Sequence, residues 1–288
     1  MFGFLNCNKP VGITSRDLVN VVQRRIRPTK VGHCGTLDPL AEGVMVLAIG
    51  PASRLTSYIQ QQAKRYIGEF RLGASSETGD LEQGFIEHPE LPIPTLSELQ
   101  AACGSLVGMI RQVPPAYSAV KVNGRRAYKR VRAGETVEMP ERTVRVDSIE
   151  IIALDYPQIT LDITCGAGTY IRTLGMDLAN AVGSKAVMTK LVRESIGSCA
   201  LSNALSVDQL QEVALEEFLL PATIAIHNLP RIMVNDQESS RIGHGLCIEM
   251  PGDFTNPEEV AAITADGQLQ ALLRPKGQVL CPKRVFCS

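Results

Sequence analysis

The 288-residue chain contains no tryptophan, and aromatic residues make up only 5% of it. No apolar run approaches the roughly 20 residues that a membrane-spanning helix needs. The first residues lack the basic stretch and apolar core of a secretory signal. We therefore expect a cytoplasmic protein with no membrane partner. The hydrophobic share of 44% and the charged share of 20% are ordinary for a globular protein and exclude wholesale disorder.

Motifs for metal and redox chemistry are also missing. None of the eight cysteines belongs to a C-x-x-C pair, and the four histidines match no zinc-ligand spacing. In a reducing compartment we expect free thiols rather than a disulfide framework. There is no Walker A motif, and the pair Gly166 and Gly168 lacks the rest of a dinucleotide fingerprint. We therefore expect no metal and no cofactor.

Charge is unevenly distributed, although the formal net charge is −1. Residues 111–145 contain nine basic and three acidic side chains, whereas residues 77–90 contain five acidic side chains and no lysine or arginine. The basic stretch could be a solvated face or a loop that binds a polyanion. Composition alone does not separate these two interpretations.

The apolar periodicity predicts strands and helices without strict βαβ alternation. Helices should begin after Thr14 and Thr95, where Asp17 and Glu98 could complete the caps. This mixture favours an α+β fold with a mainly antiparallel sheet. Further helices are expected near residues 55–59, 171–182 and 206–220, and strands at residues 43–50, 66–72, 144–146, 159–165 and 186–196.

The C-terminal part of the chain has a different sequence pattern. From about Arg231, short apolar segments are separated by turn signals, and Asp266-Gly267 between two apolar runs predicts a hairpin. At roughly 150 residues per domain, the length allows about two domains. We expect a large domain at residues 1–230 and a small β-rich domain at residues 231–288.

The densest chemical signal is the sequence GHCGTLDPLAEG at residues 32–43. Pro39 biases Asp38 toward an extended conformation, and a carboxylate held in this way suits nucleophilic or electrostatic work. An aspartate that bonds to its own turn would show the same pattern. Glu42 could make a glycosidase-type pair with Asp38, but a spacing of four in a loop fixes no geometry.

Aromatic and basic residues recur at the starts of two predicted elements. Tyr66 opens a strand directly after Lys64-Arg65, and Tyr170 and Arg172 begin a helix after a glycine turn. Each could be an ordinary core-margin or surface residue. Together with an aspartate loop and a basic segment, they indicate a pocket for a stacked base.

Five motifs occur in a fixed order along the chain. They are NKPVGITS at residues 8–15, GHCGTLDPLAEG at 32–43, KRY at 64–66, QVPPxYSAxK at 112–121 and GTYIRT at 168–173. In this order they resemble the TruB family of tRNA pseudouridine synthases, and Leu191-x-Arg193 continues the match. The resemblance covers roughly residues 1–230 and is weaker in the tail.

The resemblance implies a pseudouridine synthase fold, in which helices flank a mainly antiparallel mixed sheet. It implies a catalytic domain at residues 1–230 and a small PUA-like RNA-binding domain at residues 231–288. Residues 77–139 would be an insertion that carries a basic, RNA-gripping segment at residues 117–132. This long insertion favours the stand-alone tRNA enzyme over the guide-RNA-dependent branch.

The activity implied by the resemblance is isomerisation of uridine 55 in the T-loop of tRNA. The enzyme flips out the base, breaks the N1–C1′ bond, turns the base and joins C5 to C1′. Asp38 would be the essential carboxylate, acting either on C1′ or through a glycal. Arg172 would pair with Asp38 and keep it ionised.

The same resemblance assigns the remaining site residues. Tyr66 would stack on the target base and could serve in proton transfer, and Tyr170 and Leu191 would line the uracil pocket. His33 would fill space or contact RNA near the flipped nucleotide, and Lys9 would support the catalytic loop. The partner would be the T-arm of tRNA, and we expect a monomer with no obligate protein partner.

Two other classes of function stay open. A non-catalytic RNA-binding protein or tRNA chaperone on the same scaffold would be favoured by the loss of Asp38 or Tyr66, and both are present. A hydrolase using Asp38 and Glu42 would release a free base, which an isomerase does not.

Overall fold

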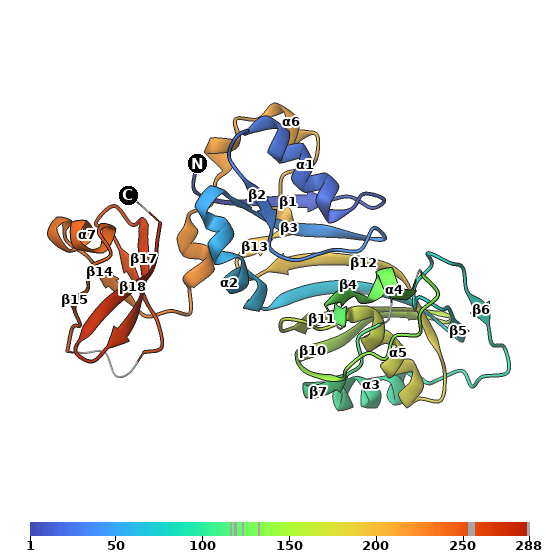
Figure 1. Ribbon diagram of the computed structural model, residues 1–288. Helices are drawn as coiled ribbons and strands as arrows, with labels where there is room; N and C mark the ends of the chain where they lie inside the picture. The colour runs from blue at the N-terminus through green and yellow to red at the C-terminus, as the bar shows by residue number, and fades with distance from the viewer. Residues whose placement is uncertain (116, 118–119, 123, 132, 253–256, 287–288) are drawn as a thin grey trace.

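The computed structural model describes the chain except for residues 116, 118–119, 123, 132, 253–256 and 287–288. The described residues form a nine-stranded sheet and a five-stranded sheet, with two short hairpins beside them. The small sheet lies at one end of the molecule, on the left in Figure 1. None of the helices in the described part of the chain is long and apolar enough to cross a membrane.

The large sheet has the order β1-β3-β12-β4-β11-β10-β7, with β2 paired to β3 and β13 paired to β12. Among its described strands, all neighbours run antiparallel except β12 and β3, which are parallel. The prediction of a mainly antiparallel α+β fold is confirmed. The strands are β1 Gly3–Lys9, β2 Val31–His33, β3 Ala41–Ile49, β4 Lys64–Leu72, β7 Gly108–Gln112, β10 Arg142–Asp155, β11 Gln158–Cys165, β12 Ala186–Ile196 and β13 Cys199–Ala200.

The parallel pairing of β3 with β12, called the seam below, joins the N-terminal strands to the rest of the sheet. It consists of the pairs Leu191–Ala41, Val192–Glu42 and Arg193–Gly43. Gly43 has φ +105°, and a Cβ there would lie 2.4 Å from the carbonyl oxygen of Arg193. A side chain at Gly43 would therefore push the two strands apart.

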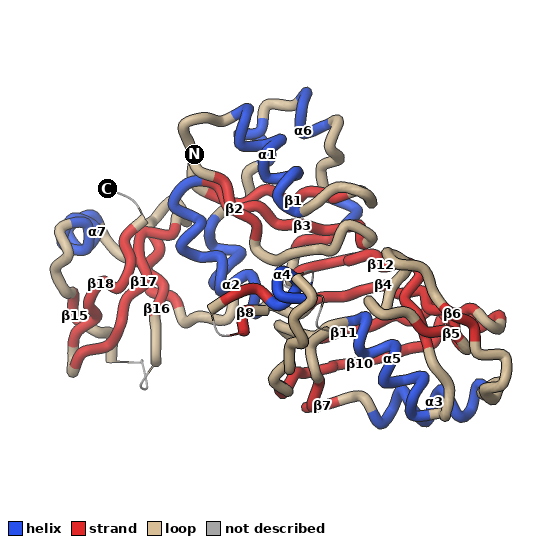
Figure 2. The backbone as a smooth tube through the Cα atoms, turned by 45° about the vertical axis from the view of Figure 1, so that its right-hand side comes forward, coloured by secondary structure: helices blue, strands red, loops and turns tan. Residues whose placement is uncertain are grey.

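Three helices cover one face of the large sheet. They are α1 Ser15–Arg25, α3 Leu96–Ser105 and α5 Ile171–Ala181, and their apolar residues share one core with alternate residues of the strands. Figure 2 shows α3 and α5 beside β7 and β10, and α1 near β1 and β2. The expected capping boxes of α1 and α3 are present at Thr14 and Thr95.

Short elements connect these layers. The turns that follow β3 and precede the small sheet are 3-10 helices at Gly50–Leu55 and Ala222–Ile226, and another lies at Leu201–Asn203. The remaining short elements are α2 Thr56–Gln61, β5 Ala74–Ser75, β6 Ile86–Glu87, β8 Lys121–Val122, β9 Arg125–Arg126 and α4 Ala127–Val131.

The helix expected over residues 206–220 is wrong in its extent. The structure has one turn, α6 Gln209–Glu212, followed by a 3-10 turn at Leu215–Phe218. Arg25 Nη1 donates to the carbonyl oxygens of Leu210 (2.9 Å) and Val213 (2.7 Å). The backbone of Leu220 pairs with Phe4. These tertiary contacts take the backbone groups that a continuous helix would use.

The small sheet has the order β14-β16-β17-β18-β15. The hairpin expected at Asp266-Gly267 joins the antiparallel strands β16 and β17. Phe286 stacks on Phe2 with 5.4 Å between ring centroids, which ties this sheet to the N-terminus. Its elements are β14 Arg231–Met233, α7 Asp236–Gly243, β15 Ile248–Glu249, β16 Val260–Ile263, β17 Leu269–Lys276 and β18 Val279–Val285.

The expectation of free thiols is wrong for one pair of cysteines. Cys247 and Cys281 form a disulfide. The pairing of Ile248 with Leu280 brings them together, although 34 residues separate them in the sequence. Cys287 lies outside the described residues. The other described cysteines are free and buried, as expected: Cys7, Cys34, Cys103, Cys165 and Cys199.

Candidate active site

A cavity of about 380 Å³ lies where the loop between β2 and β3 faces the start of α5. It collects side chains from segments that are far apart in the sequence. The residues singled out from the sequence that line it are Asp38, Tyr66, Tyr170, Arg172 and Leu191. His33 and Lys9 are described by the structure but do not line this cavity.

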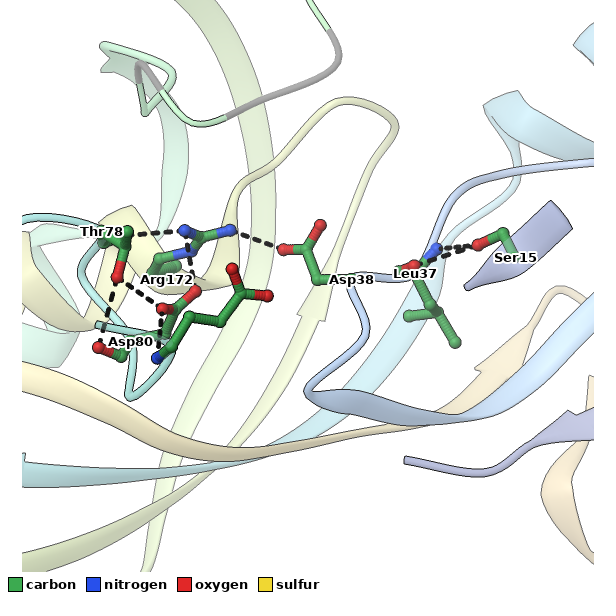
Figure 3. A network of polar contacts seen from close by, with 7 residues as sticks. Ser15, Leu37, Asp38, Thr78, Asp80 and Arg172 are labelled. Atoms are coloured by element: carbon green, nitrogen blue, oxygen red, sulfur yellow. Dashed lines mark hydrogen bonds and ion pairs between the residues drawn. The ribbon is translucent and has the colours of Figure 1, made fainter. Parts of the chain in front are cut away.

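The loop that carries Asp38 is fixed by its main chain. Ser15, the first residue of α1, accepts a hydrogen bond from Leu37 N (2.9 Å) and donates one to Leu37 O (3.0 Å). The backbone amide of Gly12 donates to Pro39 O at 2.8 Å. The Asp38 side chain keeps 43% of its surface exposed. The backbone is therefore held while the carboxylate remains accessible. Figure 3 shows the Ser15–Leu37 contacts and the Asp38 carboxylate pointing toward Arg172.

Arg172 faces Asp38 from the first turn of α5 and is only 6% exposed. Its Nη2 donates to Asp38 Oδ2 at 2.6 Å, and its Nη1 donates to the carbonyl oxygen of Thr78 at 2.6 Å. Nη1 also lies 2.9 Å from Asp80 Oδ2. The pairing of Arg172 with Asp38 that the family resemblance implies is thus present in the geometry.

Asp80 is a site residue that the sequence analysis did not identify. It is 1% exposed, and its Oδ1 accepts hydrogen bonds from Thr78 Oγ1 (2.6 Å) and from the backbone amide of Glu82 (3.1 Å). Gly79 has φ +75°, and a Cβ there would lie 3.0 Å from Arg172 Cδ. The 78–80 turn therefore wraps closely around the guanidinium. The sequence showed Asp80 only as one of five acidic residues in a run.

Tyr66 and Arg193 are paired neighbours on β4 and β12. Tyr66 is 8% exposed, and its burial raises the pKa of the phenol. Arg193 is 2% exposed and donates from Nε to Val44 O at 2.7 Å and from Nη1 to Thr36 O at 3.4 Å. A buried cation thus links the seam to the Asp38 loop. The sequence analysis placed Arg193 in a motif but gave it no role.

Two lysines are buried close to the site. Lys64 lines the cavity, donates to Gln62 O at 2.6 Å, and has its pKa lowered to about 8 by burial and then by Arg193. Lys9 donates to Pro10 O (2.8 Å) and Ile13 O (2.9 Å), and burial lowers its pKa to about 8. Lys9 therefore orders the turn whose Gly12 amide holds the Asp38 loop.

His33 occupies the last position of β2, where it pairs with Leu47 on β3. It precedes the cavity-lining segment that begins at Cys34. Its contact with RNA stays a prediction. No group of three or more His, Cys, Asp or Glu side chains among the described residues could hold a metal ion.

The basic segment, residues 117–132, forms the β8–β9 hairpin and α4. Glu135 pairs with two of its arginines, Arg125 at 3.1 Å and Arg130 at 2.6 Å. Tyr117 donates its hydroxyl to Glu77 at 3.1 Å. Five residues of the motif at 112–121 and the basic segment lie outside the described residues: Ala116, Ser118, Ala119, Asn123 and Arg132.

The chain matches known family models and relatives along most of its length. Residues 23–171 match the model "TruB family pseudouridylate synthase (N terminal domain)", and residues 229–287 match "tRNA Pseudouridine synthase II, C terminal". The tRNA pseudouridine synthase B of Rhodopirellula baltica is 40% identical, over 99% of this chain and 94% of the relative. That of a Synechocystis species is 38% identical, over 99% of this chain and 100% of the relative.

Solved structures share the fold. The chain resembles one in "Crystal Structure of a Cbf5-Nop10-Gar1 Complex", with a TM-score of 0.75, 24% identity, and coverage of 99% of this chain and 85% of that one. The fold and the matched models define a pseudouridine synthase, which is an isomerase. Within that class, the chain belongs to the TruB family.

Proposed function

We propose that this enzyme converts uridine 55 in the T-loop of tRNA to pseudouridine. The observation that carries the proposal is the accessible Asp38 carboxylate, which faces a cavity and is held by the buried Arg172. Relatives that match almost the whole chain are named tRNA pseudouridine synthase B, which supports tRNA as the substrate. The position within tRNA rests on the family resemblance.

The reaction is an internal exchange of bonds. The N1–C1′ bond breaks and its electron pair leaves with the uracil, which then turns so that C5 bonds to C1′. C5 loses a proton and N1 gains one, so the product is an isomer of the substrate. Arg172 occupies Asp38 Oδ2, so Oδ1 remains available to the ribose. That oxygen acts either by bonding to C1′, in a bond that C5 later displaces, or by removing a ribose proton that is returned when C5 bonds to C1′. Both routes need the anion.

The base must leave its stack to reach Asp38, at a cost of a few kcal/mol. We assign Tyr66 the role of stacking on the uracil, with its hydroxyl available for proton transfer. Tyr170 and Leu191 form the walls of the same cavity. Lys9 supports the Asp38 loop, and His33 fills space or contacts RNA near the flipped nucleotide.

We further propose a division of labour along the chain. Residues 1–230 would form the catalytic domain, and residues 231–288 a small RNA-binding domain. The insertion at residues 77–139 would grip the T-arm through its basic segment. The enzyme would act as a monomer.

The direct test is to incubate the purified protein with unmodified tRNA and map pseudouridine. Conversion at position 55 is expected, with no free base released. Release of uracil would instead identify a hydrolase. Tight binding of tRNA without conversion would identify a chaperone. Either outcome would overturn the proposal.

RNA binding by the basic segment can be tested through its salt dependence. Neutralising Arg125, Arg126, Lys129 and Arg130 together should lower the slope of log affinity against log salt by roughly three, since each phosphate contact adds about 0.7–0.9. Bound tRNA should still be converted.

Glu135→Gln is the complementary variant, because it frees Arg125 and Arg130 from their shared carboxylate. We expect it to strengthen binding at low salt. An unchanged slope in the neutralised variant would mean that this segment is a solvated face.

A further inference from the structure

Tyr170 is held by a residue from a distant strand. The side-chain amide of Gln112 accepts a hydrogen bond from Tyr170 N at 2.8 Å and donates one to Tyr170 O at 3.1 Å. Gln112 is the last residue of β7, and it is 1% exposed. One carboxamide therefore bonds to both backbone groups of a residue that lines the cavity.

Arg142 holds the same tyrosine by its ring. It is the cross-strand partner of Gln112, at the first position of β10. Its guanidinium carbon lies 4.6 Å from the centroid of the Tyr170 ring, and its Nη2 donates to the carbonyl oxygen of Gly168. Arg142 also lines the cavity. A planar guanidinium on an aromatic face restricts how that ring can tilt.

The position of Tyr170 gives these contacts their importance. Tyr170 is the N-cap residue of α5, and it provides no side-chain cap. Arg172, which grips Asp38, follows two residues later in the first turn. Any shift of the Tyr170 backbone therefore moves the guanidinium that orients Asp38. By holding the Tyr170 backbone, Gln112 therefore positions both Tyr170 and Arg172.

We propose that Gln112 and Arg142 are positioning residues with separable tasks. Gln112 fixes the first turn of α5 and thereby directs Arg172 toward Asp38. Arg142 fixes the Tyr170 ring as the wall against which the target base lies. This inference rests on the proposed function, because it assigns the cavity to the reacting uridine.

The two tasks predict different kinetic effects. Gln112→Met keeps the length of the side chain but loses both hydrogen bonds, so the single-turnover rate should fall about tenfold or more. Its KM for tRNA should stay within about threefold of that of the parent. Gln158→Met, on an exposed position of β11, is the matched control and should change neither quantity.

Substitution of Arg142 should have the opposite effect, with a change in KM and little change in kcat. Arg142→Lys keeps the charge but loses the planar stack on Tyr170, so KM should rise about tenfold while kcat changes less than about threefold. Arg142→Gln should behave in the same way. Full rescue by lysine would mean that only the charge matters, which would overturn the ring-positioning role. Arg71→Gln on β4, an ion-paired arginine outside the basic stretch and the cavity lining, is the control for loss of charge.

A double-mutant cycle separates positioning from a general loss of stability. If Gln112 acts through Arg172, the rate losses of Gln112→Met and Arg172→Lys should combine to much less than their product. Multiplicative losses would overturn the proposal. If Gln112→Met does not fold, Gln112→Glu takes its place in the cycle, because its carboxylate can still accept from Tyr170 N.

Failure of this inference is distinguishable from failure of the proposed function. If the unaltered protein converts no uridine in tRNA, the proposed function fails whatever the variants do. If it converts uridine and Gln112→Met does so at the same rate, only the positioning role of Gln112 is overturned.

Discussion

The two halves of the Asp38–Arg172 pair are held in different ways. Asp38 is 43% exposed and sits on a loop fixed through its backbone, whereas Arg172 is 6% exposed and surrounded by Asp38, Thr78 and Asp80. Burying a guanidinium is costly unless carboxylates and carbonyls surround it. In this structure those carboxylates and carbonyls surround Arg172 rather than Asp38. An immobile cation can then aim a carboxylate that stays accessible to substrate.

The largest effect is expected from Asp38→Asn. The amide keeps the shape but loses the charge and nucleophilicity, so the single-turnover rate should fall by at least about a thousandfold. Binding of tRNA should stay within a few fold. More than a few per cent of the parent rate would reject Asp38 as the essential group.

Glu42→Gln is the matched control for Asp38→Asn. Glu42 lies on β3, where its Oε1 is 3.8 Å from Lys190 Nζ. We expect nearly normal conversion, whereas the hydrolase alternative requires this second carboxylate.

Arg172→Lys should come next. Lysine keeps the charge but cannot reach Asp38, Thr78 and Asp80 at once with a planar fork. Loss of one or two charge-assisted hydrogen bonds should slow single-turnover conversion about 10- to 100-fold. Thermal unfolding of the same variant checks that it is folded. A near-normal rate would show that Asp38 does not depend on a fixed partner.

Asp80→Asn tests the contacts that hold Arg172 in place. The amide can keep the contacts to Thr78 and Glu82 but loses the charge beside Arg172. We expect about a tenfold slower single turnover with unchanged tRNA binding, because Arg172 loses one of its anchors. Asp162→Asn removes a more exposed ion pair, to Arg65 at 2.5 Å, among residues that do not line the cavity, and should have no effect on rate. Equal effects of the two variants would contradict a positioning role for Asp80.

The smallest effect is expected from Ser15→Ala on the Asp38 side. It removes the hydroxyl that bonds both Leu37 N and Leu37 O, and should lower the free energy of unfolding by about 1–2 kcal/mol. Because Gly12 also holds this loop, we expect at most about a fivefold loss of rate. Ser105→Ala, which removes a hydroxyl bonded to Ala102 O in α3, is the control. A loss of rate greater than that of Asp80→Asn would mean that conversion depends more on how the Asp38 loop is held than on how Arg172 is held.

Sequence reasoning succeeded where the signal is local. The capping boxes at Thr14 and Thr95, the buried strand after the Asp38 loop and the hairpin at Asp266 depend on residues a few positions apart. The motif order also identified the family, because several short patterns occur together. Their residues Asp38 and Arg172 do meet, which no spacing in the chain could establish.

What the sequence could not show depends on distant pairings. Asp80 becomes an anchor only because α5 and the 78–80 turn meet in space. The Cys247–Cys281 disulfide requires the two-residue pairing of β15 with β18. The helix expected over residues 206–220 is interrupted by Arg25, which comes from α1. In each case the deciding contact spans tens to hundreds of residues, so local periodicity carries no trace of it.

The seam has a consequence for synthesis of the chain on the ribosome. β3 emerges early, but β12, its parallel neighbour, is made about 150 residues later, and parallel pairing cannot form before then. Asp38 likewise waits 134 residues for Arg172. During that interval part of the β3 edge has no partner strand, which is a typical site of misassembly in nascent chains. Stalling translation before residue 186 should leave β3 more sensitive to protease than stalling well after residue 200, because β12 is then available to pair with it.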